Sequence, residues 1–500
     1  MRYGFVIDQD RCIGCHACTV ACKEEHSVPV GVFRTWVKYV EKGEFPYTTR
    51  HFGVLRCNHC DDSPCTEICP TRALYRRADG IVDFDNARCI GCKACMQACP
   101  YDALYIDPNT STAAKCNFCA HRVEKSLEPA CVIVCPTQAI LAGDLDHPGS
   151  KVARVVANKK VSVRKSQKGT NPKLFYVGIE GDVIEPERLS REHTYFWADR
   201  RVTQPAVDSS PGLTREIYDV FHPAPWGWKI AAYLWTKSIA AGVLLVAAIL
   251  LSMAANSSSP LLNVVAPALA LIALAVTSAL LVFDLKRPDR FFYLLTKPNF
   301  RSWLVIGTYF LIGYGACSAA WLLAGMFGAE VPSLLRWLST LFSIASACYS
   351  AFLFAQAKGR DLWQSPVFLW HLLVQALVAG SAALLIAGVL IDARATTAAT
   401  MILVISLIAD LAMIFGEITL PHVSEDIRIA TRALIRGTLS VRFWGLAIVL
   451  GLVAPICLCL AALRLADSAG VEIAAAVLAL AGLWWFEELW VKAGQVAPLS

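Results

Sequence analysis

Eight long apolar stretches follow residue 229, and they limit the fold of this chain more than any other feature. Each is long enough to cross a bilayer, which takes about 20 residues of helix, and eight in succession cannot all be buried in one soluble domain. The composition agrees, because 56% of the 500 residues are apolar and 17% are charged, against about 45–50% and about 25% in soluble domains. The sequence therefore predicts an all-α membrane domain of eight transmembrane helices over 226–500, with spans at 230–253, 261–283, 303–327, 335–356, 367–391, 398–420, 443–466 and 470–491.

The charges between these stretches predict how the chain crosses the membrane. If the first span starts in the cytoplasm, eleven Lys and Arg residues fall in cytoplasmic loops and three at the opposite face, and an excess of positive charge marks the cytoplasmic side. Met1–Asp8 has the pattern of a short strand, so no signal peptide is expected there. We expect a multi-pass protein of the inner (cytoplasmic) membrane, with both termini and the N-terminal domain in the cytoplasm. The eleven are Lys286, Arg287, Arg290, Lys297, Arg301, Lys358, Arg360, Arg428, Arg432, Arg436 and Arg442, and the three are Arg336, Arg394 and Arg464.

Sixteen of the 20 cysteines form four groups near the N-terminus. In such spacing, three neighbouring thiolates hold three corners of an iron–sulfur cube and the fourth reaches the next cube. Disulfides are disfavoured because a cytoplasmic domain is kept reduced, and structural zinc rarely uses the run C-x2-C-x2-C-x3-C-P. Sixteen thiolates match four [4Fe–4S] clusters, and a domain without a nucleotide or flavin fingerprint is expected to relay electrons. The groups are Cys12, Cys15, Cys18 and Cys22; Cys57, Cys60, Cys65 and Cys69; Cys89, Cys92, Cys95 and Cys99; and Cys116, Cys119, Cys131 and Cys135.

These motifs resemble the four-cluster ferredoxin subunit of membrane-bound molybdopterin oxidoreductases, the group of dimethyl-sulfoxide, polysulfide and tetrathionate reductases and sulfite dehydrogenase. The resemblance implies an α+β ferredoxin-like domain over 1–184 and a molybdopterin-containing catalytic subunit on another chain. It also implies that the first and fourth cysteine groups exchange ligands, as do the second and third. The implied clusters are Cys12, Cys15, Cys18 and Cys135; Cys116, Cys119, Cys131 and Cys22; Cys57, Cys60, Cys65 and Cys99; and Cys89, Cys92, Cys95 and Cys69.

The membrane half resembles the NrfD/PsrC type of quinol-handling anchor in the segments 226–234, 283–291 and 297–299. The two subunits are normally separate chains, and here they are fused. Residues 185–225, rich in proline and charge, are expected to form the linker between them. The resemblance implies that menaquinone or ubiquinone exchanges electrons with the clusters, which gives the chain a redox role with quinone oxidoreductase activity.

Polar residues inside apolar spans are costly and are functional candidates by default. Most of those in this chain fall in the cytoplasmic half of their spans, where they suit the proton chemistry of a quinone. Plainer roles remain open: Lys237 as a side chain that reaches toward the headgroups, Glu488 as an interfacial carboxylate, His371 as a packing residue, and Asp410 as a protonated acid bonded to a backbone carbonyl. Haem is disfavoured because no C-x-x-C-H motif occurs. The quinone and proton candidates are Lys237, Tyr309, His371, Gln375, Asp410 and Glu417, with Tyr233, His422, Glu487 and Glu488 near them.

A basic stretch at 151–173 contains eight Lys and Arg residues and no acid. It is expected to be a solvated surface ribbon or, alternatively, a docking surface for a catalytic subunit or lipid headgroups. The net charge of +6 is modest and predicts no nucleic-acid partner. The main hypothesis is therefore an electron-transfer and membrane-anchor subunit that connects the quinone pool to a molybdopterin subunit. The alternatives are a redox-driven proton pump acting through Asp410 and a free-standing ferredoxin–quinone oxidoreductase.

Overall fold

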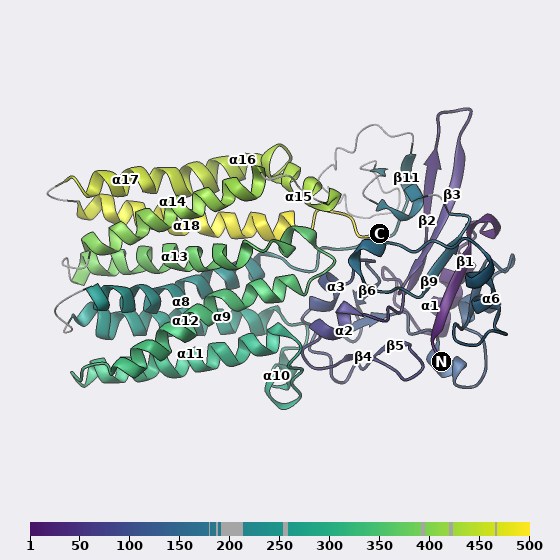
Figure 1. Cartoon of the computed structure of the whole chain (residues 1–500), viewed down its shortest axis with the longest axis horizontal. Coiled ribbons are helices and arrows are strands. Elements are labelled where there is room, and N and C mark those ends of the chain that lie inside the picture. The colour runs from purple at the N-terminus through teal and green to yellow at the C-terminus, as the bar shows by residue number, and fades with distance from the viewer. Residues whose placement is uncertain are drawn as a thin grey trace.

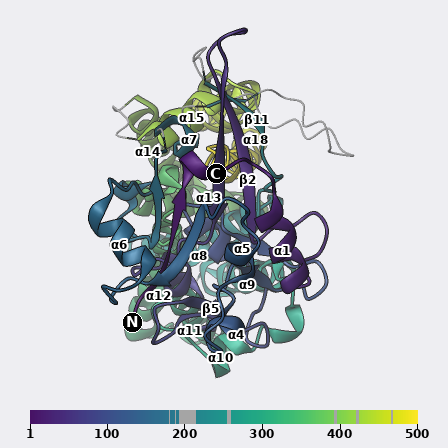
Figure 2. The same ribbon diagram turned by 90° about the vertical axis from the view of Figure 1, so that its right-hand side faces the viewer.

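The computed structural model describes residues 1–179, 181–186, 189–191, 214–253, 259–391, 396–419, 424–465 and 468–500. A domain of short strands and helices packs against one end of a long helical bundle (Figure 1). Viewed along the bundle axis from the N-terminal side, this domain lies in front of the helices, and the β2–β3 hairpin projects at its edge (Figure 2). The predicted order, an α+β domain followed by an eight-helix membrane domain, is confirmed.

The N-terminal domain is built on two small sheets. In the first, β1 lies between an antiparallel and a parallel neighbour, and its apolar residues Phe5, Val6 and Ile7 are almost completely buried. In the second, β2 and β3 pair along their whole length. The sheets have the orders β8-β1-β9 and β10-β11-β2-β3, formed by β1 (Tyr3–Asp8), β8 (Ile140–Asp144), β9 (Leu174–Val177), β2 (Thr35–Lys42), β3 (Thr49–Arg56), β10 (Ser190–Arg191) and β11 (Thr214–Tyr218).

Short helices carry the cysteines between these sheets. The turns that lead into them use left-handed backbone, with a φ of 59° at His16 before α1 and 63° at Lys93 before α3. Two-stranded ribbons, β4–β5 and β6–β7, separate the helices. The bounds are α1 (Ala17–Glu25), α2 (Pro64–Ile68), α3 (Ala94–Ala98), α4 (Ala120–Val123), α5 (Ala130–Ile133), β4 (Leu74–Arg76), β5 (Val82–Phe84), β6 (Leu104–Ile106) and β7 (Ala113–Lys115).

The expected linker at 185–225 needs correction at its C-terminal end. Strand β11 pairs with β2, and Lys38 of β2 places its Nζ 2.6 Å from Glu216 Oε2, with both side chains buried. Residues 192–213 of the expected linker lie outside the described residues. β10, near its start, and β11, in its last part, are therefore strands of the N-terminal domain, and a buried ion pair and a strand ladder hold β11 there.

All eight predicted spans are long apolar helices. The first and fifth, α8 and α13, cross at the centre of the bundle. At this crossing a Cβ on Gly242 would clash with the backbone of Ala376, and one on Gly380 would clash with Gly242, so only small residues allow the approach. The spans are α8 (Trp228–Met253), η4 with α9 (Leu261–Asp284), α11 (Trp303–Met326), α12 (Ser333–Ala355), α13 (Phe368–Ile391), α14 (Thr396–Thr419), α16 with η8 and α17 (Ser440–Ala462), and α18 (Ala469–Ala493).

Candidate iron–sulfur and quinone sites

The fold gathers the cysteines, and two cavities are each lined by one of the sets that the family resemblance implies. One cavity is lined by Cys12, Cys15, Cys18 and Cys135, and another by Cys69, Cys89, Cys92 and Cys95. In the remaining sets, Cys22 interacts electrostatically with Cys116, Cys119 and Cys131, and Cys65 with Cys57, Cys60 and Cys99.

Burial makes several of these thiols poor acids. Burial, with a contribution from Cys69 and Cys89, raises the pKa of Cys92 to about 12. Burial likewise raises the pKa of Cys18 to about 11, with Cys131 and Cys12 adding to the shift. Metal ligation requires thiolates, so a bound cation must offset both the burial and the mutual repulsion. Iron supplies that charge in the cysteine-rich sites of ferredoxins.

Arg56 places a buried positive charge between two of these sets, where an anionic cluster would bind. Its guanidinium is fully buried, donates a hydrogen bond from Nη1 to Cys131 Sγ at 3.0 Å, and interacts electrostatically with Cys116 and Cys18. Its Nε and Nη2 have no hydrogen-bond partner among the described residues. Buried donors without acceptors are rare in proteins, and cluster sulfurs are acceptors of the right charge. The residues present therefore fit iron–sulfur clusters.

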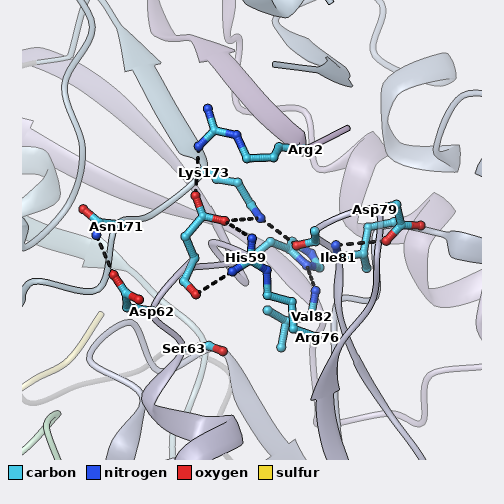
Figure 3. A network of polar contacts seen from close by, with 12 residues as sticks. Arg2, His59, Asp62, Ser63, Arg76, Asp79, Ile81, Val82, Asn171 and Lys173 are labelled. Atoms are coloured by element: carbon cyan, nitrogen blue, oxygen red, sulfur yellow. Dashed lines mark hydrogen bonds and ion pairs between the residues drawn. The ribbon is translucent and has the colours of Figure 1, made fainter. Parts of the chain in front are cut away.

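A polar network fixes the loop that carries Cys57 and Cys60. Asp61, next in sequence, accepts contacts from three cations: Arg2 Nη1 at 3.1 Å, Arg76 Nη2 at 2.9 Å and Lys173 Nζ at 3.0 Å. Lys173 also donates to the Gly80 carbonyl at 2.6 Å. Figure 3 shows how these side chains converge from separate parts of the domain. The loop is thereby tied to β1, β4 and the start of β9.

His59 lies in the same loop as a neutral imidazole. Burial lowers its pKa well below the usual range, and the charges of Lys115, Lys173 and Arg56 lower it further. Its Nδ1 accepts a hydrogen bond from the Val82 amide at 3.2 Å (Figure 3). This bond assigns the ring proton to Nε2.

The set formed by Cys69, Cys89, Cys92 and Cys95 lies directly on the membrane half. Asn299 donates to the Cys69 carbonyl at 2.8 Å, Arg290 to the Cys89 carbonyl at 3.0 Å, and Trp226 Nε1 to the Cys92 carbonyl at 3.4 Å. Gly91 has a φ of 69°, and a Cβ there would meet Lys286. Loops predicted to be cytoplasmic thus hold the cysteine domain.

The basic stretch at 151–173 is not a solvated ribbon throughout, and that expectation is wrong for its later part. Arg164 donates to the Leu499 carbonyl at 2.8 Å. Lys168 is 8% exposed in its side chain and pairs with Asp361, and its Nζ lies 3.8 Å from Asp426 in α15 (Glu425–Ile435). These residues bind the membrane half of the same chain.

Aromatic side chains connect this cysteine set to the interior of the bundle. Neighbouring ring centroids are 4.9–6.0 Å apart along the whole series. Such offset and edge-on packing is favourable for aromatic rings. The series starts at the Cys92 carbonyl and ends at a buried histidine, in the order Trp226, Trp363, Phe354, Phe368, Trp490, Phe486 and His371.

His371 of α13 is completely buried and faces two carboxylates of α14. Its Nε2 lies 2.9 Å from Asp410 Oδ1, and its Nδ1 lies 3.5 Å from Glu417 Oε2. Gln375 Nε2 lies 3.2 Å from His371 Nε2. Asp410 and Glu417 are seven residues apart and share one helix face. On the side of the cysteine domain, Glu417 Oε1 accepts a hydrogen bond from Ser365.

Lys237 and Glu487 extend this polar group toward α12. Lys237 is 1% exposed and donates from Nζ to the Ala347 carbonyl at 2.6 Å, so it does not reach out to the headgroups. Glu487 interacts electrostatically with Lys237, Asp410 and His371. Both of its carboxylate oxygens are buried; they have no well-formed hydrogen bond among the described residues, and Ser238 of α8 is a close polar neighbour. We call Lys237, His371, Gln375, Asp410, Glu417 and Glu487 the buried polar cluster.

The remaining candidates, Tyr309, Glu488 and His422, do not belong to the buried polar cluster. Tyr309 does not join the cluster: it is 40% exposed on α11 and stacks on Phe300, with centroids 5.7 Å apart. Glu488 pairs with Lys492 at 2.5 Å. His422 lies outside the described residues. The sequence reasoning missed Tyr349 of α12, which hydrogen-bonds Tyr233, because a tyrosine in an apolar helix gives no sign of the direction in which it points.

Comparison with known proteins identifies the family. The family described as polysulphide reductase, NrfD, matches residues 218–498, which is more than half of the chain. The chain belongs to the NrfD polysulphide reductase family. A 4Fe-4S dicluster domain and a 4Fe-4S binding domain match residues 49–145 and 3–24 of this NrfD-family protein.

The N-terminal part of this NrfD-family protein is similar to several subunits of reductases. The B subunit of tetrathionate reductase from Salmonella typhimurium is 42% identical over 202 residues, 40% of this chain and 80% of the relative. The B subunit of polysulfide reductase from Wolinella succinogenes is 44% identical over 189 residues, 37% of this chain and 98% of the relative. The thiosulfate reductase electron transfer subunit PhsB of Salmonella typhi is 45% identical over 163 residues, 32% of this chain and 84% of the relative. The prediction of an iron–sulfur electron-transfer domain fused to an NrfD-type membrane domain is confirmed.

Proposed function

We propose that this chain relays electrons between a membrane quinone and a separate molybdopterin catalytic subunit through four [4Fe–4S] clusters. The observation that carries the proposal is the contact between the Cys69, Cys89, Cys92 and Cys95 set and the membrane half, where Trp226 starts an aromatic series that ends at His371. Bound clusters would supply one-electron carriers. The chain's own residues position them and handle the protons.

The buried polar cluster is proposed as the place of quinone chemistry. A hydroquinone must lose two protons as it loses two electrons, so its oxygens need bases that can pass protons on. His371 beside Asp410 and Glu417 is such a base, because the two carboxylates stabilise the imidazolium that forms. Gln375 can donate to a quinone carbonyl. Extraction of the purified protein would identify the quinone as menaquinone or ubiquinone.

The cysteine domain is proposed to face the cytoplasm. The end of the bundle that it covers carries the basic loops, including Lys286, Arg290 and Arg360. Arg360 donates to Gln97 of the cysteine domain at 2.9 Å. Under the positive-inside rule this end is cytoplasmic. The arrangement supports a multi-pass protein of the inner membrane, in contact with lipid around the bundle.

A catalytic subunit is proposed to dock at the opposite end of the cysteine domain. There Cys15 is exposed, in the set with Cys12, Cys18 and Cys135. Relatives named as parts of tetrathionate, polysulfide and thiosulfate reductases support a partner of this class. Sulfite dehydrogenase and dimethyl-sulfoxide reductase are further members of the same class of partner.

Purification from native membranes in mild detergent tests the proposal. We expect about 16 iron atoms per chain, from four cubes, a large co-purifying subunit with molybdenum or tungsten, and a bound quinone that extraction identifies. Added hydroquinone should change the cluster signals in electron paramagnetic resonance. Iron without a large partner would instead support a free-standing ferredoxin–quinone oxidoreductase. Clusters that neither gain electrons from a hydroquinone nor lose them to a quinone would refute both functions.

A further inference from the structure

Three serines of α12 form a buried row that has no hydrogen-bond partner among the residues that the structure describes. Ser339, Ser343 and Ser346 are at most 1% exposed, and none of their hydroxyls is bonded within the described part of the chain. Their spacing of four and three residues puts them on one face of the helix. A buried hydroxyl without a partner destabilises a folded protein, so three in a row require an explanation.

Other hydroxyls in these spans donate a hydrogen bond to a backbone carbonyl of their own helix. Thr340, also on α12, donates to the Arg336 carbonyl one turn earlier at 2.9 Å. Ser318 of α11 and Ser381 of α13 make the same kind of bond, at 2.7 Å and 2.6 Å. The three serines of the row do not turn back to their own helix in this way. They are therefore free to bind another molecule, and water is the small ligand that suits isolated hydroxyls.

The row leads from the far side of the membrane to the buried polar cluster. Helix α12 starts at Ser333, at the bundle end away from the cysteine domain, and ends next to that domain (Figure 1). Ser350, four residues after Ser346, bonds Tyr233 at 2.6 Å. From Ser339 to Ser350 the helix rises about 16 Å, about half of the hydrocarbon thickness.

Glu487 is a second, independent sign of water at the inner end of the row. Both of its carboxylate oxygens are buried without a well-formed hydrogen bond among the described residues, although Ser238 of α8 lies close enough to interact with them and Lys237 and His371 lie within electrostatic range. Lys237 donates to the Ala347 carbonyl, which directly follows Ser346. A carboxylate inside a bilayer needs a charged partner, a proton or water, and a row of open hydroxyls ends beside it.

We propose that a file of water molecules along α12, held by Ser339, Ser343 and Ser346, joins Lys237 and Glu487 to the membrane face opposite the cysteine domain and carries the protons of quinone chemistry. This inference rests on the proposed quinone function. When a hydroquinone is oxidised, its two electrons go to the clusters, and two O–H bonds break. The two protons pass through Glu487 to the water file and leave at the opposite face. Quinone reduction takes up two protons by the reverse path.

A labelling experiment tests the water file without any quinone turnover. Ser343→Cys in proteoliposomes is exposed to 2-aminoethyl methanethiosulfonate, and mass spectrometry of the peptides gives the labelling rate. Ser381→Cys is the matched control, since Ser381 is also fully buried but its hydroxyl is bonded to its own helix. A thiol in contact with water should react faster by about tenfold or more than a dry one. Equal, slow labelling of both would overturn the proposal.

A proton measurement tests the direction of the path. Proteoliposomes contain trapped pyranine, a pH-sensitive dye, and receive decylubiquinol or menadiol as the electron donor. Ferricyanide, the electron acceptor, is present only outside, so only chains whose cysteine domain faces outward turn over. We expect the vesicle interior to become acidic. A Ser343→Val and Ser346→Val double variant should slow this acidification by about tenfold or more, while Ser381→Val leaves it unchanged. Protons released outside would show that they leave past Glu417 and Ser365, and would refute the inference while the quinone function stands. A wild-type chain that reduces no ferricyanide would refute the quinone function, and with it the proton path, whatever the labelling rates.

Discussion

Replacement of Arg56 should lower the reduction potential of the clusters beside it. Its guanidinium is fully buried and lies 3.0 Å from Cys131 Sγ, between the set of Cys18 and the set of Cys116 and Cys131. A cluster that takes up an electron gains negative charge, and a fixed positive charge nearby stabilises that state. Arg56→Gln removes the charge and retains a hydrogen-bond donor of similar reach.

The size of the effect follows from Coulomb's law. Because the added electron spreads over the cube, a separation of roughly 6 Å is appropriate, and at an effective dielectric constant of about 20 the interaction is about 2.8 kcal/mol. For a one-electron couple, about 1.4 kcal/mol corresponds to about 59 mV, so the midpoint should fall by about 120 mV. Arg56→Lys keeps the charge and should shift the midpoint by less than about half of this.

Redox titration followed by electron paramagnetic resonance measures the midpoints. The matched control is Arg50→Gln, on the same strand β3, where the side chain is 52% exposed and pairs with Glu41 at the surface. Solvent screens such a charge, so the control should leave the midpoints unchanged. Iron content per chain verifies that the variants hold their clusters. If Arg56→Gln with full iron leaves every midpoint within about 20 mV of the wild type, the electrostatic reasoning is wrong.

Three further perturbations follow from the structure. Asp61→Asn leaves Lys173 buried without its carboxylate and should lower the free energy of unfolding, measured by denaturant titration, by about 2–3 kcal/mol. The control is Asp146→Asn, which removes an exposed pair with Arg2 and should lower the free energy of unfolding by under about 1 kcal/mol. An equal loss in both would contradict the role of Asp61. Asp410→Asn should slow ferricyanide reduction by hydroquinone by about 100-fold, whereas Glu472→Gln, which changes a buried acid near the start of α18, should not. Unchanged turnover in Asp410→Asn would show that Asp410 takes no part in the proton chemistry. Asp284→Ala leaves Lys93 without its carboxylate at the junction of the two halves and should lower the melting temperature, measured by differential scanning calorimetry, by roughly 4–8 °C. The control is Asp289→Ala, whose carboxylate is mostly exposed, and it should leave the melting temperature unchanged.

Much of the architecture could be predicted because it depends on local patterns. The four cysteine groups are recognisable from spacing alone, since cluster ligation requires thiolates at short, fixed intervals. The eight spans are recognisable because any bilayer-crossing helix needs about 20 apolar residues. The seven-residue spacing of Asp410 and Glu417 also predicts correctly that they share a face. These features need no knowledge of which segments are neighbours.

Contacts between distant segments were decided by the tertiary structure. Lys168 pairs with Asp361 of the membrane half although its basic neighbours suggest an exposed ribbon, and β11 joins a sheet although its surroundings suggest a linker. Arg56 between two cysteine sets carries no sequence signal, because Cys131, which accepts its hydrogen bond, lies 75 residues away in the chain.

The membrane half shows the same division most clearly. Its helices are apolar on every side, so periodicity does not reveal which face is inward. Tyr309 and Tyr349 are therefore equivalent in sequence, yet the first lies on the outer surface and the second bonds Tyr233 inside the bundle. The row of Ser339, Ser343 and Ser346 is likewise recognisable only once α12 is packed. The chain alone determines that polar groups enter the membrane, and helix packing determines which of them meet.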